Sequence, residues 1–380
     1  MEGTRTLKRT RLVRLLAACA LCLGLAFAFA GCSGGGSEGA SGGDAPKNDQ
    51  AAESATRTFT DSAGREVEVP AQIDRIAPAG HTATQVLLTM APDKLATLSQ
   101  ELTADQAKYL GGDYADLPVT GAAFGAKGDL NKEAVAAAGA QILIDTGEAK
   151  DGIKEDLDTL QTQLGIPVVF VETTMDTYGD AYEMLGELLG MEDRGAELSA
   201  YCKNAYDETV SVMAGIPEDQ RVRVAYLLGD AGTNTIAKNS YQGQVVDLVA
   251  NNVADLGKVS GSGSGTEVSL EQVSLWDPEL ILFQEGSIYD TVGSDPAWAD
   301  LSAVKSGNYY EVPGAPWCWL NNPPTVNQVL GMQWLPRLLY PDHYDDDMYD
   351  TVAGYFKTFY GYDLSESEFN EIAANAQPKA

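Results

Sequence analysis

The chain has 380 residues, with 25 basic and 55 acidic side chains and a formal net charge of −30 at pH 7. A field of that sign repels nucleic-acid phosphates, which argues against a DNA or RNA partner. The length is sufficient for two domains. Three of the five cysteines fall within the first 32 residues. The other two, Cys202 and Cys318, lack the Cys/His spacing of a zinc site, and we expect two separate thiols rather than a disulfide.

Residues 1–31 have the composition of a secretory signal peptide. Five basic residues precede an apolar run at 15–30, which ends in small residues. This run is shorter than the ~20 residues that a spanning helix needs, so a transmembrane anchor is the weaker alternative. Residues 30–32, Ala-Gly-Cys, resemble a bacterial lipobox, in which the cysteine is lipidated and becomes the mature N-terminus. We therefore expect a lipid on Cys32.

A flexible tether is expected to follow this cysteine. Residues 32–57 are rich in Gly and Ser, a composition that behaves as a flexible coil. A lipid, a tether and then a folded region describe a protein held at the extracytoplasmic face of the cell membrane. No covalent cofactor is expected beyond that lipid.

Residues 58–175 are predicted to form an N-terminal α/β lobe. Alternating apolar and polar residues at 58–70 indicate a small hairpin. Short apolar runs then alternate with helical stretches, a pattern that predicts βαβ units and a mostly parallel sheet. The predicted strands lie within 75–80, 141–147 and 167–173, and the predicted helices within 82–92, 130–140 and 156–165.

The pattern changes at 176–215, which carries no strand signal. One helix is expected to end at Gly190, and a second of about 23 residues follows, a rod of roughly 35 Å. The α/β pattern resumes at 216–325 as a C-terminal lobe, and 326–380 is expected to form helices that pack on that lobe. The predicted fold class is therefore α/β, with two Rossmann-like lobes of mostly parallel sheets joined by one long bridging α-helix.

A weak internal repeat relates the two lobes. Glu133 and Glu271 each stand two residues after a residue that can cap a helix, and each stands eleven residues before a strand position. An acid in the first turn of a helix complements the helix dipole, which is the simplest interpretation. Recurrence in both lobes favours a second interpretation, a pair of exposed acids that docks a partner.

Several stretches, in this order and spacing, resemble the substrate-binding lipoproteins of ATP-driven importers for ferric siderophores, haem and cobalamin. They are IDRIAPAG, LNKEAVAAAGAQILID, LGIPVVFVET, VSLEQVSLWDPELILF, DPAWADLSAVKSGNYYEVPG, WLPRLLYPD and YFKTFYGYDLS, within 58–370. The resemblance implies two lobes bridged by a long rigid helix, a ligand in the cleft between them, and a monomer that serves a permease and an ATPase. It also implies that Glu133 and Glu271 pair with arginines of the permease.

Ligand contacts are expected in the turns that follow strands, because ligands bind outside the carboxyl ends of strands in open α/β sheets. Each aromatic candidate has the simpler alternative of lying in the core. We expect one of the two tryptophans to face the cleft and the other to pack into the lobe. The candidates are His81, Phe124 and Lys127 in the N-lobe and Tyr241, Trp317, Trp319 and Asn321 in the C-lobe.

The aromatic residues favour an iron or cobalt chelate as the ligand, namely a ferric siderophore, haem or cobalamin. A metal oxyanion such as molybdate or tungstate is the alternative, which would need backbone amides and Ser, Thr or Asn donors instead. Two histidines in the whole chain exclude imidazole-rich chelation of a bare metal. An enzyme is not favoured, since GCSGG at 31–35 fits a serine-nucleophile motif but lies in the signal and tether. A surface sensor or adhesion protein, or an unrecognised α/β enzyme, remains the other-class alternative.

Overall fold

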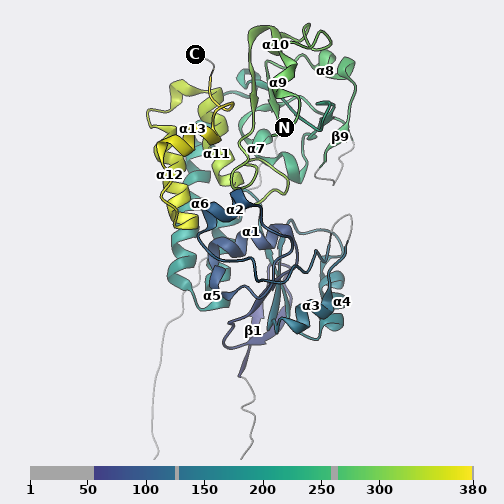
Figure 1. The fold of residues 1–380 in the computed structure, drawn as a ribbon, viewed down its shortest axis with the longest axis vertical. Helices are drawn as coiled ribbons and strands as arrows, with labels where there is room; N and C mark the ends of the chain where they lie inside the picture. Colours follow the sequence, from purple (N-terminus) through teal and green to yellow (C-terminus); the bar gives the residue numbers. More distant parts are fainter. Residues whose placement is uncertain (1–54, 125–127, 258–263, 379–380) are drawn as a thin grey trace, which may run out of the picture. The chain divides into compact units, whose positions relative to one another are not determined.

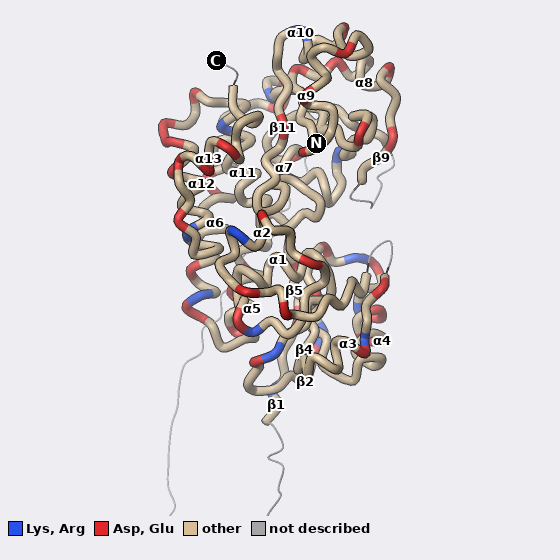
Figure 2. The backbone as a smooth tube through the Cα atoms, viewed as in Figure 1, with Lys and Arg blue, Asp and Glu red and all other residues tan. Residues whose placement is uncertain are grey.

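The computed structural model describes residues 55–124, 128–257 and 264–378 (Figure 1). All of them belong to one compact unit of the chain, Glu53–Ala380. The proposed signal peptide, Cys32 and Lys127 lie outside the described residues. Acidic side chains are spread over both lobes and basic ones are few (Figure 2). Within the described ranges, no helix is both long enough and apolar enough to cross a membrane.

The N-lobe is built on a three-stranded parallel sheet in the order β3-β4-β5. A separate antiparallel hairpin, β1 with β2, confirms the predicted hairpin. Strand β4 is buried on both faces, as expected for a central parallel strand covered by helices. The strands are β1 (Thr56–Thr60), β2 (Glu66–Pro70), β3 (Ile76–Pro78), β4 (Ile142–Gly147) and β5 (Val168–Glu172). The helices are α1 (His81–Met90), η1 (Pro92–Lys94), α2 (Ala104–Leu110), α3 (Lys132–Ala137) and α4 (Ile153–Leu164).

Two helices follow the N-lobe sheet, α5 (Tyr178–Leu189) and α6 (Glu192–Ala214). Helix α5 ends at Gly190, and α6 has 23 residues, both as predicted. The close packing of these two helices requires glycine at position 195. A Cβ there would lie only 2.6 Å from the Tyr182 carbonyl oxygen and 2.9 Å from Cα of Gly186. Helix α6 also contacts α1 of the N-lobe and helices α7 and α11 of the C-terminal part. It is therefore the predicted bridge.

The C-lobe sheet follows the order β11-β10-β6-β7-β9, and β8 pairs with β6. Strands β11, β10, β6 and β8 run parallel, whereas β7 and β9 pair antiparallel. The strands are β6 (Arg223–Leu228), β7 (Asn234–Thr235), β8 (Asn251–Asn252), β9 (Thr266–Glu267), β10 (Leu280–Phe283) and β11 (Tyr309–Glu311). The helices are η2 (Glu218–Gln220), η3 (Tyr241–Gly243), α7 (Gln244–Val249), α8 (Leu270–Trp276), α9 (Tyr289–Val292) and α10 (Ser302–Ser306). Two α/β lobes of mostly parallel sheets thus confirm the predicted fold class.

The C-terminal helices contact the C-lobe through α11 and α7, and they also contact the N-lobe, which sequence analysis did not anticipate. They are α11 (Gln328–Leu339), η4 (Pro341–His343), α12 (Met348–Tyr360) and α13 (Glu366–Ile372). Helix α12 contacts α1 and α2 of the N-lobe as well as α11. The ring of Tyr109 on α2 meets Phe356 and Tyr362 edge-on, each at 5.2 Å between ring centroids. Lys108 on the same helix forms an ion pair with Glu368 of α13 at 2.8 Å.

Candidate ligand-binding site

The carboxyl edges of the two sheets are joined by hydrogen bonds between the lobes. The Tyr241 hydroxyl of η3 donates to the carbonyl of Thr173, just after β5, at 2.8 Å. The amide of Met175 donates to the side-chain oxygen of Gln244 on α7 at 3.0 Å. The Thr325 hydroxyl donates to the side-chain oxygen of Gln85 on α1. The turns after the N-lobe strands therefore meet the C-lobe, where the sequence placed the ligand.

The turn after β3 presents the start of α1 at this junction. Helix α1 begins after Gly80 with no side-chain cap and no acidic residue in its first turn. Its first residue, His81, is exposed, and its Nδ1 lies 2.9 Å from the Ser99 hydroxyl. Partial burial lowers the pKa of His81, although Asp129 opposes that shift. Unpaired amides at a helix N-terminus favour negative charge, so this turn can accept an anion.

Phe124 lies beside that turn and keeps 38 % of its surface exposed. Its loop is held there because the amide of Ala123 donates to the carbonyl of Ala79 at 2.7 Å. The loop is also tied to Asp129, whose carboxylate accepts from the amide of Ala122 at 3.1 Å. The segments that carry Phe124 and His81 are therefore joined by a backbone hydrogen bond, and contact of either residue with ligand stays a prediction.

Tyr241 lines a cavity of about 530 Å³ at the junction of the lobes. The cavity wall combines Glu148 and Asp176 of the N-lobe, Tyr206 of α6 and Asp247 of the C-lobe. Burial raises the pKa of Tyr241, so its hydroxyl is neutral and acts as the donor seen toward Thr173. Carboxylates dominate the charged lining, which makes this cavity unsuited to an anion.

The stretch that carries both candidate tryptophans lies inside the protein. Trp319 is fully buried; its Nε1 donates to the Ala315 carbonyl at 2.9 Å, and its ring meets Trp334 edge-on. Trp317 retains 5 % exposure and packs near Tyr360 of α12. The expectation that one ring faces the cleft is therefore wrong for this conformation. The physical reason is that 314–325 is an irregular loop covered by α11 and α12, so strand alternation does not govern its side chains.

Asn321 is also fully buried, contrary to its expected place on the cleft surface. Its side-chain oxygen accepts from the Tyr226 hydroxyl at 2.7 Å. The Cys318 thiol donates weakly to the same oxygen at 3.5 Å. Cys202 and Cys318 are free thiols, as expected. The loop after β11 is thus a buried polar network that supports the C-lobe.

Several buried polar atoms at this junction have no hydrogen-bond partner among the described residues. The hydroxyls of Thr146 and Thr173 stand at the ends of β4 and β5, and both residues are almost fully buried. The amide nitrogen of Gln85 on α1 is also unpaired. Register places Thr146 beside Val171, two residues before Thr173, so the two hydroxyls share one sheet face. Sequence analysis missed all three residues, although Gln85 interrupts the apolar face of α1.

Two acids near the junction were missed as well. Burial raises the pKa of Asp145, on β4, to about 7. Burial and the nearby Glu311 and Asp105 carboxylates raise the pKa of Glu285, which follows β10. A Cβ on Gly314 would overlap the Glu285 carboxylate, which explains why a glycine opens the loop. Nothing in the local sequence distinguishes these two carboxyls from the other acidic residues.

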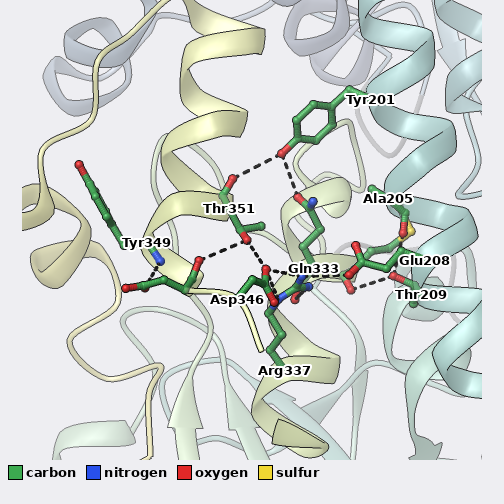
Figure 3. Close-up of polar contacts among 11 residues, drawn as sticks. Tyr201, Ala205, Glu208, Thr209, Gln333, Arg337, Asp346, Tyr349 and Thr351 are labelled. Carbon is green, nitrogen blue, oxygen red and sulfur yellow. Dashed lines mark hydrogen bonds and ion pairs between the residues drawn. The ribbon is translucent and has the colours of Figure 1, made fainter. Parts of the chain in front are cut away.

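A second cavity, of about 650 Å³, lies between α6, α11 and α12. Arg337 of α11 lines this cavity and forms ion pairs with Asp346 at 2.7 Å and with Glu208 at 3.1 Å, as Figure 3 shows. The guanidinium also stacks 4.2 Å from the centre of the Tyr344 ring. Its charge is therefore matched within the chain, and this network fastens three helices rather than presenting a free cation.

The repeated glutamates occupy equivalent places in the two lobes. Asn131 caps α3 and Ser269 caps α8, each accepting a backbone N–H in the first turn. Glu133 and Glu271 are the second residues of these helices and are exposed. Neither forms an ion pair with another described residue. A hydrogen bond with its own amide and one with Ser269 lower the pKa of Glu271, so capping accounts for part of its role. Across the described ranges, no three His, Cys, Asp or Glu residues are placed to hold a metal ion.

Comparison with known proteins gives a family match and a structural match. A family model described as periplasmic binding protein matches residues 89–316. An ABC transporter solute binding protein from Sulfurospirillum deleyianum shares the fold with a TM-score of 0.76 and 28 % identity. That alignment covers 83 % of this chain and 98 % of the other.

Two curated relatives carry different ligand names. The molybdate-binding protein MolA of Haemophilus influenzae is 25 % identical over 334 residues, which is 80 % of this chain and 91 % of MolA. The Fe(3+)-citrate-binding protein YfmC of Bacillus subtilis is 26 % identical over 199 residues, which is 51 % of this chain and 60 % of YfmC. A structure of MolA bound to molybdate has a TM-score of 0.65 at 21 % identity, which shows only that the two proteins share a fold.

Proposed function

Because the chain belongs to the periplasmic binding protein family, which serves ABC importers outside the cytoplasm, we propose that it captures a small metal oxyanion of the molybdate class and delivers it to such an importer. Its partners are then a permease, an ATPase and a small solute. Membership of this family indicates a role in transport rather than in catalysis. The lipid on Cys32 is part of the same proposal, since it would hold the protein beside the permease.

The uncapped start of α1 carries the oxyanion proposal. This ten-residue helix begins at the junction of the lobes with no side-chain cap and no acid in its first turn. Backbone N–H groups in that position offer hydrogen bonds and a favourable dipole to a small anion, worth roughly 0.3–1 kcal/mol per charge at an exposed site. His81 stands at the same point with an exposed imidazole that can add a donor.

The argument for a flat chelate loses its main support in the structure. A flat chelate would need exposed aromatic rings to stack on, whereas Trp317 is nearly buried and Trp319 is fully buried. The unpaired groups near α1 are instead the neutral side chains of Gln85, Thr146 and Thr173, which suit a compact, oxygen-rich ligand. Similarity to a molybdate-binding protein over most of both chains also supports the oxyanion. Similarity to a ferric citrate-binding protein makes that compact chelate the second candidate.

Isothermal titration of the purified protein tests the proposal. Molybdate and tungstate should each bind at one site and compete with one another. Ferric citrate, a ferric siderophore, haem and cobalamin are titrated in parallel. His81→Ala should weaken molybdate binding by about tenfold, the loss of one good hydrogen bond to a charged group. His343→Ala is the matched control, because His343 is exposed in η4. Saturable binding of a chelate with no response to either oxyanion would refute the ligand assignment.

Glu133 and Glu271 are proposed to dock the two lobes on the permease. Both are exposed and stand at equivalent places in α3 and α8. Exposed ion pairs contribute only about 0–1 kcal/mol each, so they would orient docking more than drive it. Reversing both charges to Lys should abolish uptake while ligand titration stays unchanged. Import at the wild-type rate by the double variant would refute these roles.

A further inference from the structure

Large apolar side chains are exposed at few places in the described part of the chain. Four of them keep more than a third of their surface in solvent. They are Val119 at 42 %, Phe124 at 38 %, Val210 at 37 % and Leu275 at 79 %. An isolated exposed aliphatic residue is ordinary on a protein surface. Of these residues, Leu275 lies on the glutamate-bearing helix α8, and Val119 and Phe124 lie in the segment that precedes the glutamate-bearing helix α3.

In the C-lobe, Leu275 belongs to α8 itself. It stands four residues after Glu271, so the two side chains are neighbours on one face of the helix. The opposite face is fixed in the lobe by Val273, which is fully buried. Leu275 therefore projects from the helix beside the carboxylate, with most of its side chain in solvent.

In the N-lobe, Val119 and Phe124 flank the start of α3. The carbonyl of Thr120, the residue after Val119, accepts from the amide of Asn131 at 2.7 Å. Asn131 is the cap of α3, two residues before Glu133. Phe124 lies in the loop between these points. Each lobe thus presents exposed apolar surface next to an exposed carboxylate that has no ion-pair partner among the described residues.

We propose that Val119 and Leu275 are apolar anchors of the permease-docking surface, each seating in an apolar socket beside a basic residue of the permease. This inference rests on the proposed function. The occupant is a permease rather than a second copy of this chain, because both patches carry negative charge and two copies would repel. One patch lies before α3 and the other on α8, and both helices carry the proposed docking glutamates, so a partner seated on both patches would contact both lobes.

The two kinds of contact predict different responses to salt. Burying the side chain of Leu275 removes apolar surface from water, an effect that salt does not screen. The Glu133 and Glu271 contacts are exposed ion pairs, which lose strength as the Debye length falls from ~10 Å at 0.1 M salt toward ~3 Å at 1 M. Leu275 should therefore set the dissociation rate, while the glutamates set the association rate.

The test measures binding of the full lipoprotein to the permease and ATPase subunits of an ABC importer from the same organism that takes up its ligand, held in nanodiscs. Leu275→Ser should weaken binding by about tenfold, the effect of losing roughly half of a buried leucine side chain. That loss should be the same at 50 and 500 mM salt. Val210→Ser on α6 is the matched control, an exposed aliphatic residue away from both patches, and should bind as wild type does. Ligand titration and thermal unfolding check that each variant is folded.

Three outcomes overturn the inference, and they separate it from the transport role. If Leu275→Ser binds as wild type while Glu133→Lys and Glu271→Lys weaken binding, the apolar anchors are wrong and docking by the glutamates stands. If wild type does not bind the nanodiscs, both the docking glutamates and the anchors are wrong, whatever the ligand titration shows. If Leu275→Ser instead abolishes a concentration-dependent dimer of wild type, the occupant is a second copy of this chain.

Discussion

Asp145 makes the stability of this protein depend on pH. It lies on the central strand β4, is 9 % exposed, and pairs in register with Phe170 of β5. Burial raises its pKa from 3.8 to about 7, although the amide of Thr146 and the charge of Lys150 oppose the shift. The folded protein therefore holds a proton on this carboxyl at pH values where the unfolded chain has released it.

The sign and the size follow from proton linkage. A pKa raised by folding gives stability that is complete below about pH 4 and is lost as pH rises toward about 7. With the two pKa values above, the free energy of unfolding should fall by about 3 kcal/mol between pH 5 and pH 8 through this residue. Asn has the same shape and no charge, so Asp145→Asn should remove this part of the pH dependence.

Urea unfolding of wild type and Asp145→Asn at pH 5, 6, 7 and 8 measures the effect. The variant should be the more stable protein at pH 8 and should lose its advantage toward pH 5. Asp116→Asn is the control, because Asp116 is exposed in the loop after α2. Parallel pH profiles for wild type and Asp145→Asn would show that burial does not hold the proton and would refute the reasoning.

Three further predictions concern packing between elements. Trp319→Phe should lower the free energy of unfolding by about 1–2 kcal/mol, since it removes the hydrogen bond to the Ala315 carbonyl. Ligand affinity should stay unchanged, and a lower affinity would place this ring in the binding site. Arg337→Ala should cost about 1–2 kcal/mol in thermal or urea unfolding at pH 7. Hydrogen bonds from Arg337 and Thr351 outweigh burial and lower the pKa of Asp346, so the Asp346 part of this cost should begin to decline as pH falls below about 4. A cost that stays equal as pH falls until Asp346 is protonated would contradict it. Tyr109→Ala should lower the free energy of unfolding by about 3–4 kcal/mol, because it removes the contacts with Phe356 and Tyr362. The variant should also show a larger ligand-induced change in radius of gyration than wild type, measured by X-ray scattering. The same change in both proteins would show that α2 does not restrain the lobes.

The sequence predicted the elements whose pattern is local. Alternation in 58–70 gave the hairpin, and helical spacing with a closing glycine gave α5 and its end at Gly190. The 23-residue length of α6 followed from the absence of strand signals between Asp176 and Gly215. The two caps, Asn131 and Ser269, also came from local pattern. All of these depend on contacts within a few residues, which a single sequence carries.

The features that sequence analysis missed depend on contacts between distant segments. The direction of the Trp317 and Trp319 rings is set by α11 and α12, which cover their loop. The burial of Asp145 is set by β3, β5 and the helices around them. The aromatic contact between α2 and α12 joins residues about 250 positions apart in the sequence. Hydrophobic periodicity reports only on neighbouring residues, so it could not predict this contact. Candidate residues in turns after strands were therefore easier to place than those in the covered loop.

The path of the C-terminal helices bears on how the lobes can move. A single bridging helix would allow the lobes to hinge about it. Here α12 and α13 form a second connection, because they pack on α2 in the N-lobe while the chain after α13 returns to the C-lobe. There the amide of Glu311 donates to the carbonyl of Asn375 at 3.0 Å, and the indole of Trp334 donates to the carbonyl of Ala376 at 2.9 Å. Arg194 of α6 adds a tie, donating to the carbonyls of Thr89 on α1 and Phe359 on α12. Two connections on separate segments leave less freedom than one, so we expect ligand capture to use a small closing motion and preformed groups at the start of α1 rather than a wide swing of the lobes.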